Sequence, residues 1–278
     1  MTESLYYILL FSILGVFALL IAKANHFFRY EKRVELPLTG KALLTFFGIY
    51  LASTLLLAPF LLFSAHKVYS SLPLSVFSAI QIATLGAIFL LFFLYARAYD
   101  LPLIKRIWKA PIQRAASIPF DIGIGVLTWI IAFPLVAAIG ESLDLLLNAV
   151  FGVQNYEQVA VRYLKHSISS LPSMIIPLIT ILIAAPIIEE FLFRGCLQTY
   201  FKRKMGIRSA IALSSLCFAL FHFSPSQGVG NLALVVSLFT FSLFLGFIYE
   251  RQASLFASIG LHITFNTLST IRIIFFPD

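Results

Sequence analysis

The chain has 278 residues, of which 60% are hydrophobic and only 12% are charged, and its formal net charge is +8. A soluble domain carries about 25% charged residues, so this composition excludes an ordinary soluble protein. The basic residues sit in short loops between apolar runs, and for that reason the positive charge does not predict nucleic-acid binding. The sequence predicts an integral, multi-pass membrane protein with the lipid bilayer as its surroundings and no nucleic acid as its partner.

Eight apolar runs approach the length of about 20 residues that a helix needs to cross a bilayer. We expect all of them to be helices, because a helix satisfies its own backbone polar groups in lipid. The fold class is therefore all-α and polytopic, with about eight transmembrane helices. In chain order the runs are 5–22, 42–63, 75–95, 119–139, 171–192, 207–223, 230–248 and 254–275. The first run has Glu3 and no early Lys or Arg, which favours an uncleaved span over a signal peptide.

The loops between the runs alternate in their content of Lys and Arg. The loops 23–41 and 96–118 carry five each, whereas the loop 64–74 carries one. The positive-inside rule then places both chain termini outside the cytoplasm. The longest loop, 140–170, is too polar to span, but its leucines recur at helical spacing. We expect an interfacial helix there, on the outer side, that acts as a passive connector, with a lid or lateral gate as the alternative.

Ionisable side chains inside the apolar runs are concentrated in the last four of them, where Asn266 accompanies them. They are Glu189, Glu190, Arg194, His222 and His262. At 1.5 Å per residue, the carboxylates and both histidines fall roughly 15–20 Å from the basic end of their helices. Because a charge near the bilayer centre costs about 3 kcal/mol, this shared depth predicts one polar site built from three helices.

Helical spacing divides this site into pairs. Glu190 and Arg194 are four residues apart with the acid first, which is the favourable order for an ion pair. Glu189 lies about 100° around the helix from Glu190 and is not paired with Arg194. We therefore expect Glu189 to be the carboxylate that exchanges protons. His262 shares a helix face with Asn266.

Phe218 precedes His222 by four residues and would cover the imidazole with an aromatic ring. Two chemistries suit this set of residues. In the first, a carboxylate near a histidine activates water, while a histidine and an amide donate to a developing oxyanion. In the second, one glutamate and two histidines hold Zn²⁺ with one position left open. The residues alone leave both readings open. The sequence contains no HExxH, GxGD or GxSxG pattern that would indicate other protease chemistries.

Three segments carry a resemblance to a known family. "EEFLFR" at 189–194, "FALFH" at 218–222 and "HITFN" at 262–266 follow the patterns EExxxR, FxxxH and HxxxN in that order. In this the sequence resembles the type II CAAX prenyl endopeptidases, also called the CPBP or Abi family of intramembrane proteases. The resemblance covers roughly residues 115–275. We therefore divide the continuous membrane domain into N-terminal helices, 1–114, and a protease-like core, 115–278.

The resemblance implies a role for each matching residue. Glu189 is similar to the glutamate that activates water with the help of a histidine, here His222. His262 and Asn266 are similar to the pair that stabilises the oxyanion. Glu190, Arg194 and Phe218 would support them. This account needs no metal ligand set, and we expect no cofactor, although zinc is not ruled out by the residue types.

The family further implies an endopeptidase that cleaves a membrane-embedded peptide or a lipidated, CAAX-like protein. The plasma membrane of a bacterium is the expected location. Two alternatives remain beside it: a non-catalytic immunity or scaffold protein, and a proton-coupled transporter. A transporter relay would string its acids across the depth of the bilayer, whereas these residues share one depth.

Overall fold

A computed structural model describes residues 2–29, 35–69, 72–110, 117–152, 165 and 171–275. Within these ranges the chain is helical and contains no β-strand, apart from a single bridge between Lys109 and Ser254. The all-α, polytopic membrane fold expected from the sequence is confirmed.

The first three predicted spans appear as three long rods. α1 runs from Thr2 to Ala24. The second rod joins α2 (Gly40–Ala52), the π-helical turn η1 (Ser53–Leu57) and α3 (Ala58–His66). The π turn ends two residues before Pro59, which has no backbone N–H to continue the α-helical pattern. α4 (Leu74–Tyr99) is the third rod.

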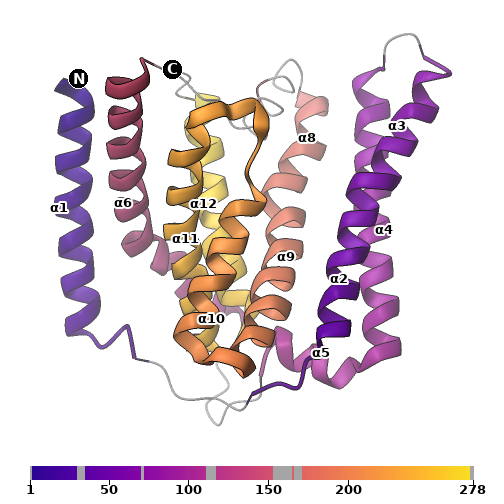
Figure 1. The fold of residues 1–278 in the computed structure, drawn as a ribbon, viewed down its shortest axis with the longest axis horizontal. Coiled ribbons are helices and arrows are strands. Elements are labelled where there is room, and N and C mark those ends of the chain that lie inside the picture. Colours follow the sequence, from indigo (N-terminus) through magenta and orange to yellow (C-terminus); the bar gives the residue numbers. More distant parts are fainter. Residues whose placement is uncertain are drawn as a thin grey trace.

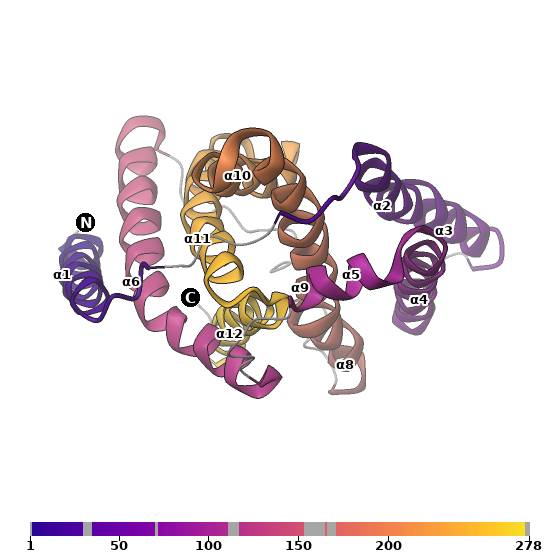
Figure 2. The same cartoon turned by 90° about the horizontal axis from the view of Figure 1, so that it is seen from below.

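A short helix that we did not predict follows α4. α5 (Leu101–Trp108) starts at Asp100, whose side chain caps the helix by accepting from the N–H of Leu103. Leu103, Ile104 and Ile107 are buried, whereas Lys105 and Arg106 are exposed. Figures 1 and 2 show α5 lying across one end of the bundle. Such a two-faced helix at a bundle end is typical of an interfacial segment.

The fourth predicted span is longer than expected. α6 (Ile118–Phe151) begins behind the cap residue Ser117 and ends at Gly152, which adopts a left-handed conformation with φ 63°. Residues 140–151 thus continue α6 and do not form a separate interfacial helix, so this part of the prediction for 140–170 is wrong. Of the remainder, only Gly152 and Lys165 lie among the described residues.

The C-terminal half contains the remaining elements. They are α8 (Leu171–Ile179), the π-helical segment η2 (Thr180–Ala184), α9 (Ala185–Glu190), the π-helical segment η3 (Phe191–Gln198), α10 (Thr199–Phe221), the 3₁₀ segment η4 (Pro225–Gly230), α11 (Asn231–Gln252) and α12 (Leu255–Phe275). Within α10 the chain turns at Gly206, with φ 79° and ψ 172°, a conformation that glycine adopts without strain.

Six helices in the described residues are long and apolar enough to cross a membrane. One of them, Met174–Phe221, contains the turn at Gly206 and therefore has two arms. α12 spans 21 residues but carries His262, Asn266 and Arg272, and it is not among the six. The count of eight spans stays a prediction. α1 begins and α12 ends at the same end of the bundle, as an even count requires (Figure 1).

The helices form three groups when the molecule is viewed along the bundle. α1 and α6 lie on one side, α2, α3 and α4 on the other, and α9 to α12 lie between them (Figure 2). α6 crosses α12 very closely: a Cβ on Gly125 would overlap the carbonyl of Ala257, and a Cβ on Gly260 would lie 2.7 Å from the carbonyl of Ile122. Small residues at such a crossing let two backbones approach, a common device between membrane helices.

Candidate active site

The two adjacent glutamates lie at the end of a short α-helix between two π-helical segments. α9 has six residues, with η2 before it and η3 after it. η2 ends two residues before Pro186, as η1 does before Pro59, so proline again interrupts the α-helical hydrogen bonding. Such π segments inside helices are frequent at functional sites, because they change which side chains face inward.

Glu190 is fully buried and is engaged on both sides. Its Oε1 lies 2.8 Å from Nδ1 of His262, and its Oε2 lies 3.3 Å from Nε of Arg194. The contact with Arg194 is an ion pair without the alignment of a hydrogen bond. The predicted pairing of Glu190 with Arg194 is confirmed. The structure adds the imidazole of His262 as a partner of Glu190, which the sequence did not predict.

Arg194 is buried at 0% exposure and holds three helices together. Its Nη2 donates to Oγ of Ser242 on α11 at 2.6 Å, and its guanidinium carbon lies 4.5 Å above the ring of Phe218 on α10. A buried guanidinium needs this many partners because removing its charge from water is costly. Phe218 therefore serves both Arg194 and His222, whose ring centroid is 4.7 Å from its own.

Glu189 faces both histidines. Its Oε2 lies 4.0 Å from Nε2 of His222 and 3.8 Å from Nε2 of His262. The Glu189 side chain is 16% exposed and that of His222 is 31% exposed, whereas Glu190 is sealed. The structure thus brings together an acid and two imidazoles from α9, α10 and α12, and leaves the acid accessible to a small molecule such as water.

The Nδ1 atom of each histidine is already committed. Nδ1 of His222 lies 2.8 Å from the carbonyl oxygen of Phe218, and a carbonyl can only accept, so Nδ1 carries the proton. Nδ1 of His262 lies 2.8 Å from the Glu190 carboxylate, which assigns its proton in the same way when that carboxylate is ionised. Both rings consequently turn Nε2 toward Glu189, a fixed orientation of the kind that active-site imidazoles require.

Hydrogen bonds in the loop that follows α10 help to position His222. α10 ends at Phe221, and His222 caps it with φ −90° and ψ 0°. The Asn231 side chain then ties the following loop: it accepts from the N–H of Ser224 at 2.9 Å and donates to the carbonyl of Ser224 at 2.7 Å. Sequence reasoning missed Asn231 and Ser242. Asn231 follows a Pro- and Gly-containing turn, which is a signal for a capping role, but nothing marks Ser242 in its apolar run.

Asn266 lies one helical turn beyond His262 on α12, as predicted. Its amide nitrogen donates to the carbonyl of Ile181 in η2 at 2.9 Å. That carbonyl lies in the π-helical segment, where the usual α-helical bonds are shifted. One amide hydrogen is therefore used to tie α12 to η2, and the second remains for another acceptor.

The donor set has the chemistry that zinc requires but not the spacing. The Glu189 oxygen and the two Nε2 atoms have the right chemistry, and the bonds at each Nδ1 resemble those behind metal-bound histidines. However, two ligands of a tetrahedral Zn²⁺ at about 2.0–2.1 Å lie roughly 3.3 Å apart, less than the 3.8 Å and 4.0 Å observed here. Among the described residues no group of three or more His, Cys, Asp or Glu side chains fits a metal ion. As described, the site does not fit zinc.

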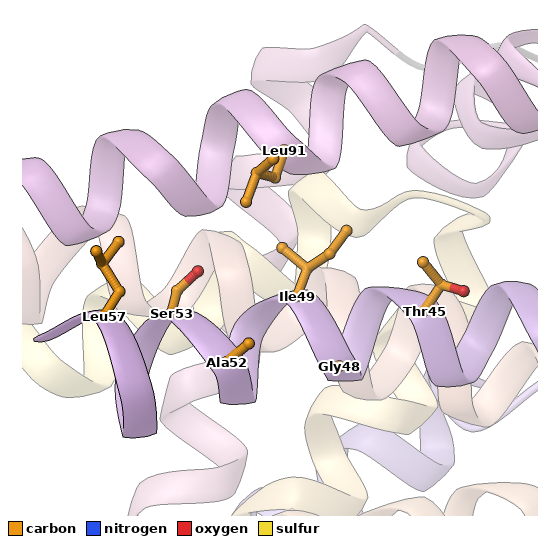
Figure 3. A pocket seen from close by; sticks show the side chains of 7 residues that line it. All are labelled: Thr45, Gly48, Ile49, Ala52, Ser53, Leu57 and Leu91. Atoms are coloured by element: carbon orange, nitrogen blue, oxygen red, sulfur yellow. The ribbon is translucent and has the colours of Figure 1, made fainter. Parts of the chain in front are cut away.

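Two hollows lie on the α2–α4 side of the molecule. A groove of about 470 Å³ runs between α2 and α4 (Figure 3), and its lining comprises Thr45, Gly48, Ile49, Ala52, Ser53, Leu57 and Leu91. A second, apolar cavity of about 260 Å³ lies between α4, α5 and α9. Its lining includes Ile187, Ile188 and Phe191, which bracket the two glutamates in the sequence. Neither lining includes the glutamates or histidines of the candidate site.

The comparisons with known proteins agree with the motifs. Residues 171–268 match the model of a family described as type II CAAX prenyl endopeptidase Rce1-like. The match starts well after residue 115, the expected start of the resemblance. No curated protein and no solved structure matches the chain. Through residues 171–268, which contain all three motifs, the chain is therefore similar to the Rce1-like type II CAAX prenyl endopeptidases, as the resemblance predicted.

Proposed function

We propose that this chain is an intramembrane endopeptidase in which Glu189 activates a water molecule with the help of His222. The observation that carries the proposal is the convergence of three helices on one carboxylate oxygen: Oε2 of Glu189 lies within 4.0 Å of Nε2 of both His222 and His262. Separations of 3.8 Å and 4.0 Å are too long for direct hydrogen bonds and leave space for a bridging water.

In the proposed reaction, the Glu189 carboxylate accepts a proton from this water as the water oxygen bonds to the peptide carbonyl carbon. Nε2 of His222 accepts a hydrogen bond from the other O–H of the water, which keeps that hydrogen, because Nδ1 of His222 donates to Phe218. The carbonyl π electrons move to oxygen and form an oxyanion. When this intermediate collapses, the C–N bond breaks and Glu189 returns its proton to the leaving amine.

The oxyanion needs donors that are fixed before the reaction. A His262 ring protonated on both nitrogens donates from Nε2 to the oxyanion while Nδ1 stays bonded to Glu190. In that state two carboxylates face one imidazolium and the Arg194 guanidinium, so the cluster carries no net charge. Asn266 would supply a second donor from its remaining amide hydrogen. Glu190 and Arg194 thus support the reaction by keeping the net charge of the cluster at zero.

The substrate class follows from the surroundings of the site. The histidines and glutamates lie on helices that are apolar enough to cross a membrane, or next to them, so the substrate must be membrane-embedded or carry a lipid. The apolar cavity beside Ile188 and Phe191 suits a hydrophobic group on such a substrate, including a prenyl chain. We place the protein in a bacterial plasma membrane. The single level of the acids disfavours a transporter relay, which leaves an immunity or scaffold protein as the second candidate.

The test compares wild-type protein with Glu189→Gln in liposomes. The probe is a quenched fluorogenic peptide that ends in a farnesylated cysteine followed by three residues, and a second probe lacks the farnesyl group. We expect the wild type to cleave and Glu189→Gln to lose activity by about 10⁴-fold or more, since the general base is removed. Glu3→Gln, a change in α1 outside the candidate site, is the matched control and should behave as wild type.

A parallel measurement needs no assumed substrate. Mass spectrometry of membrane peptides from cells that express wild type or Glu189→Ala should show fragments only with the wild type. Equal fragment patterns in both strains, together with equal cleavage of both probes by Glu189→Gln, would contradict the peptidase and favour the immunity or scaffold protein.

A further inference from the structure

A helix outside the family match packs alongside the segment that carries the glutamates. α2 precedes residue 171 by more than a hundred positions, yet it runs antiparallel to η3 and the start of α10. Gly40 lies against the ring of Tyr200, since a Cβ there would be 3.4 Å from the Tyr200 hydroxyl. Seven residues further along α2, the ring of Phe47 packs edge-on against Phe193 at 5.5 Å.

This antiparallel register places the next aromatic residue of α2 beside the site. Gly40 faces Tyr200, and Phe47, seven residues later in α2, faces Phe193, which is seven residues earlier than Tyr200. Three more residues along α2 lead to Tyr50, and three positions back from Phe193 lead to Glu190. Tyr50 is therefore level with the glutamate pair, on the inner face that it shares with Phe46 and Phe47.

The immediate surroundings of Tyr50 agree with that register. Its ring centroid is 5.8 Å from that of Phe221, the residue directly before His222. Glu189 and Tyr50 thus lie at the same level on facing helices, and the negative charge of Glu189 interacts with the Tyr50 phenol. Among the described residues the Tyr50 hydroxyl has no hydrogen-bond partner. Buried polar groups generally form hydrogen bonds, and the acceptor available to this partly buried phenol is the Glu189 carboxylate.

We propose that Tyr50 is a positioning residue of the active site, whose hydroxyl donates a hydrogen bond to the Glu189 carboxylate through one bridging water. Of the two imidazole nitrogens around Oε2 of Glu189, Nε2 of His222 accepts, and Nε2 of His262 serves the oxyanion in the proposed reaction. A phenol, which carries its proton at neutral pH, supplies a further donor for this carboxylate. It would fix the carboxylate rotamer and so hold the attacking water in line.

The effect on hydrolysis rests on the proposed function, whereas the hydrogen bond does not, and the test separates the two. Tyr50→Phe removes only the hydroxyl and keeps the ring that packs on Phe221. Tyr95→Phe is the matched control: Tyr95 lies in the same aromatic cluster, with its ring 5.0 Å from that of Phe46, but on α4. Both variants should keep the thermal stability of the wild type, measured in detergent.

The first readout is infrared difference spectroscopy on the protein in liposomes, recorded between acidic and neutral buffer. The carboxyl band that disappears in Glu189→Gln is assigned to Glu189. Tyr50→Phe should shift this band to higher frequency, because the carboxyl group loses a hydrogen bond, and Tyr95→Phe should leave it in place. An unmoved band in Tyr50→Phe overturns the proposal, whatever the enzyme does with any peptide.

The second readout is the kinetics with the farnesylated fluorogenic peptide. We expect Tyr50→Phe to lower kcat about tenfold, as the loss of one hydrogen bond to a charged group predicts, with KM within about twofold of the wild type. A shifted band with unchanged kcat would also overturn the positioning role. If the wild type cleaves neither probe, the proposed function fails, and the infrared band alone still decides whether Tyr50 bonds to Glu189.

Discussion

The N-terminal and C-terminal helices of this molecule are about equally apolar in sequence but are used differently. In the most apolar window of α1 and of the Gly40–His66 rod, 11% of the residues are buried, against 39% in Met174–Phe221 and in Pro225–Gln252. The first rods present large side chains such as Phe17 and Phe60 outward, with 62% and 64% of their surface exposed. The C-terminal helices turn inward on each other.

The difference follows from the polar residues. A charge in hydrocarbon must find partners, and partners come only from neighbouring helices that surround it. The helices that carry the motifs supply such partners for Glu190 and Arg194, so they pack tightly around them. α1 and α3 carry no such groups in their middle and need no inner partner, which makes them tolerant of change. The following predictions each pair one change in the core with one in the N-terminal helices.

After Glu189→Gln, the largest effect on turnover is expected for His222→Ala. Loss of the imidazole removes the acceptor that orients the attacking water, and general acid–base groups contribute about 10²–10⁴-fold to rate. Because the His222 side chain is 31% exposed and sits at a helix end, stability should change little. His66→Ala, at the end of α3, should leave turnover unchanged. Initial rates with the fluorogenic peptide measure both variants, and equal rates for the two would remove His222 from the site.

Arg194→Met should cause the largest loss of stability. It leaves the Glu190 carboxylate buried without its cation, and breaking a buried pair in this way costs about 3–5 kcal/mol. The matched change is Lys67→Met, because Lys67 is exposed and only covers the ring of Phe63 at 4.7 Å. That change should cost less than about 0.5 kcal/mol. Unfolding in mixed micelles with increasing SDS gives both values, and similar midpoints would show that Arg194 does not hold the core together.

The sequence predicted the parts of this site that depend on helical spacing and on shared depth. The Glu190–Arg194 pair and the contact of the Phe218 ring with His222 follow from four-residue spacing. The meeting of Glu189 with two imidazoles follows from their similar distances to the basic helix ends. Both rules can be applied to one helix by itself, without knowing how the helices pack against each other.

The sequence did not predict what depends on contacts between helices. Ser242 looks like any serine in an apolar run until α11 packs against Arg194. The bond from His262 to Glu190 likewise needs the crossing of α9 and α12. The boundary of α6 was missed for a different reason: residues 140–151 are polar enough to end a span, but Gly152 ends the helix only later. The composition of a helix indicates whether it lies in lipid or in water, whereas its capping residues determine where it ends.

A smaller effect is expected for Asn266→Ala. An oxyanion donor contributes about 10²–10³-fold when it acts alone. Here one amide hydrogen already bonds to Ile181, and His262 shares the task, so we expect a loss of roughly 10–100-fold in kcat with little change in KM. The N-terminal counterpart is Asn25→Ala, since the Asn25 amide also donates to a main-chain carbonyl, that of Ile21, at 2.9 Å. It should not change kcat. If Asn266→Ala lowered stability and left kcat intact, its role would be structural.

The smallest effect, and the finest comparison, comes from adding one methyl group to a glycine in each region. In Gly125→Ala the new Cβ would overlap the carbonyl of Ala257, so α6 and α12 must move apart. Overpacking of this kind costs about 1–3 kcal/mol. In Gly48→Ala nothing lies within 4 Å of the new Cβ, and alanine is the better helix former by about 1 kcal/mol, so the variant should be as stable as the wild type or more so. Because α12 carries His262, Gly125→Ala should also slow turnover, whereas Gly48→Ala should not. If both variants unfolded at the same SDS fraction, the close crossing of α6 and α12 would not be what fixes His262 opposite Glu189.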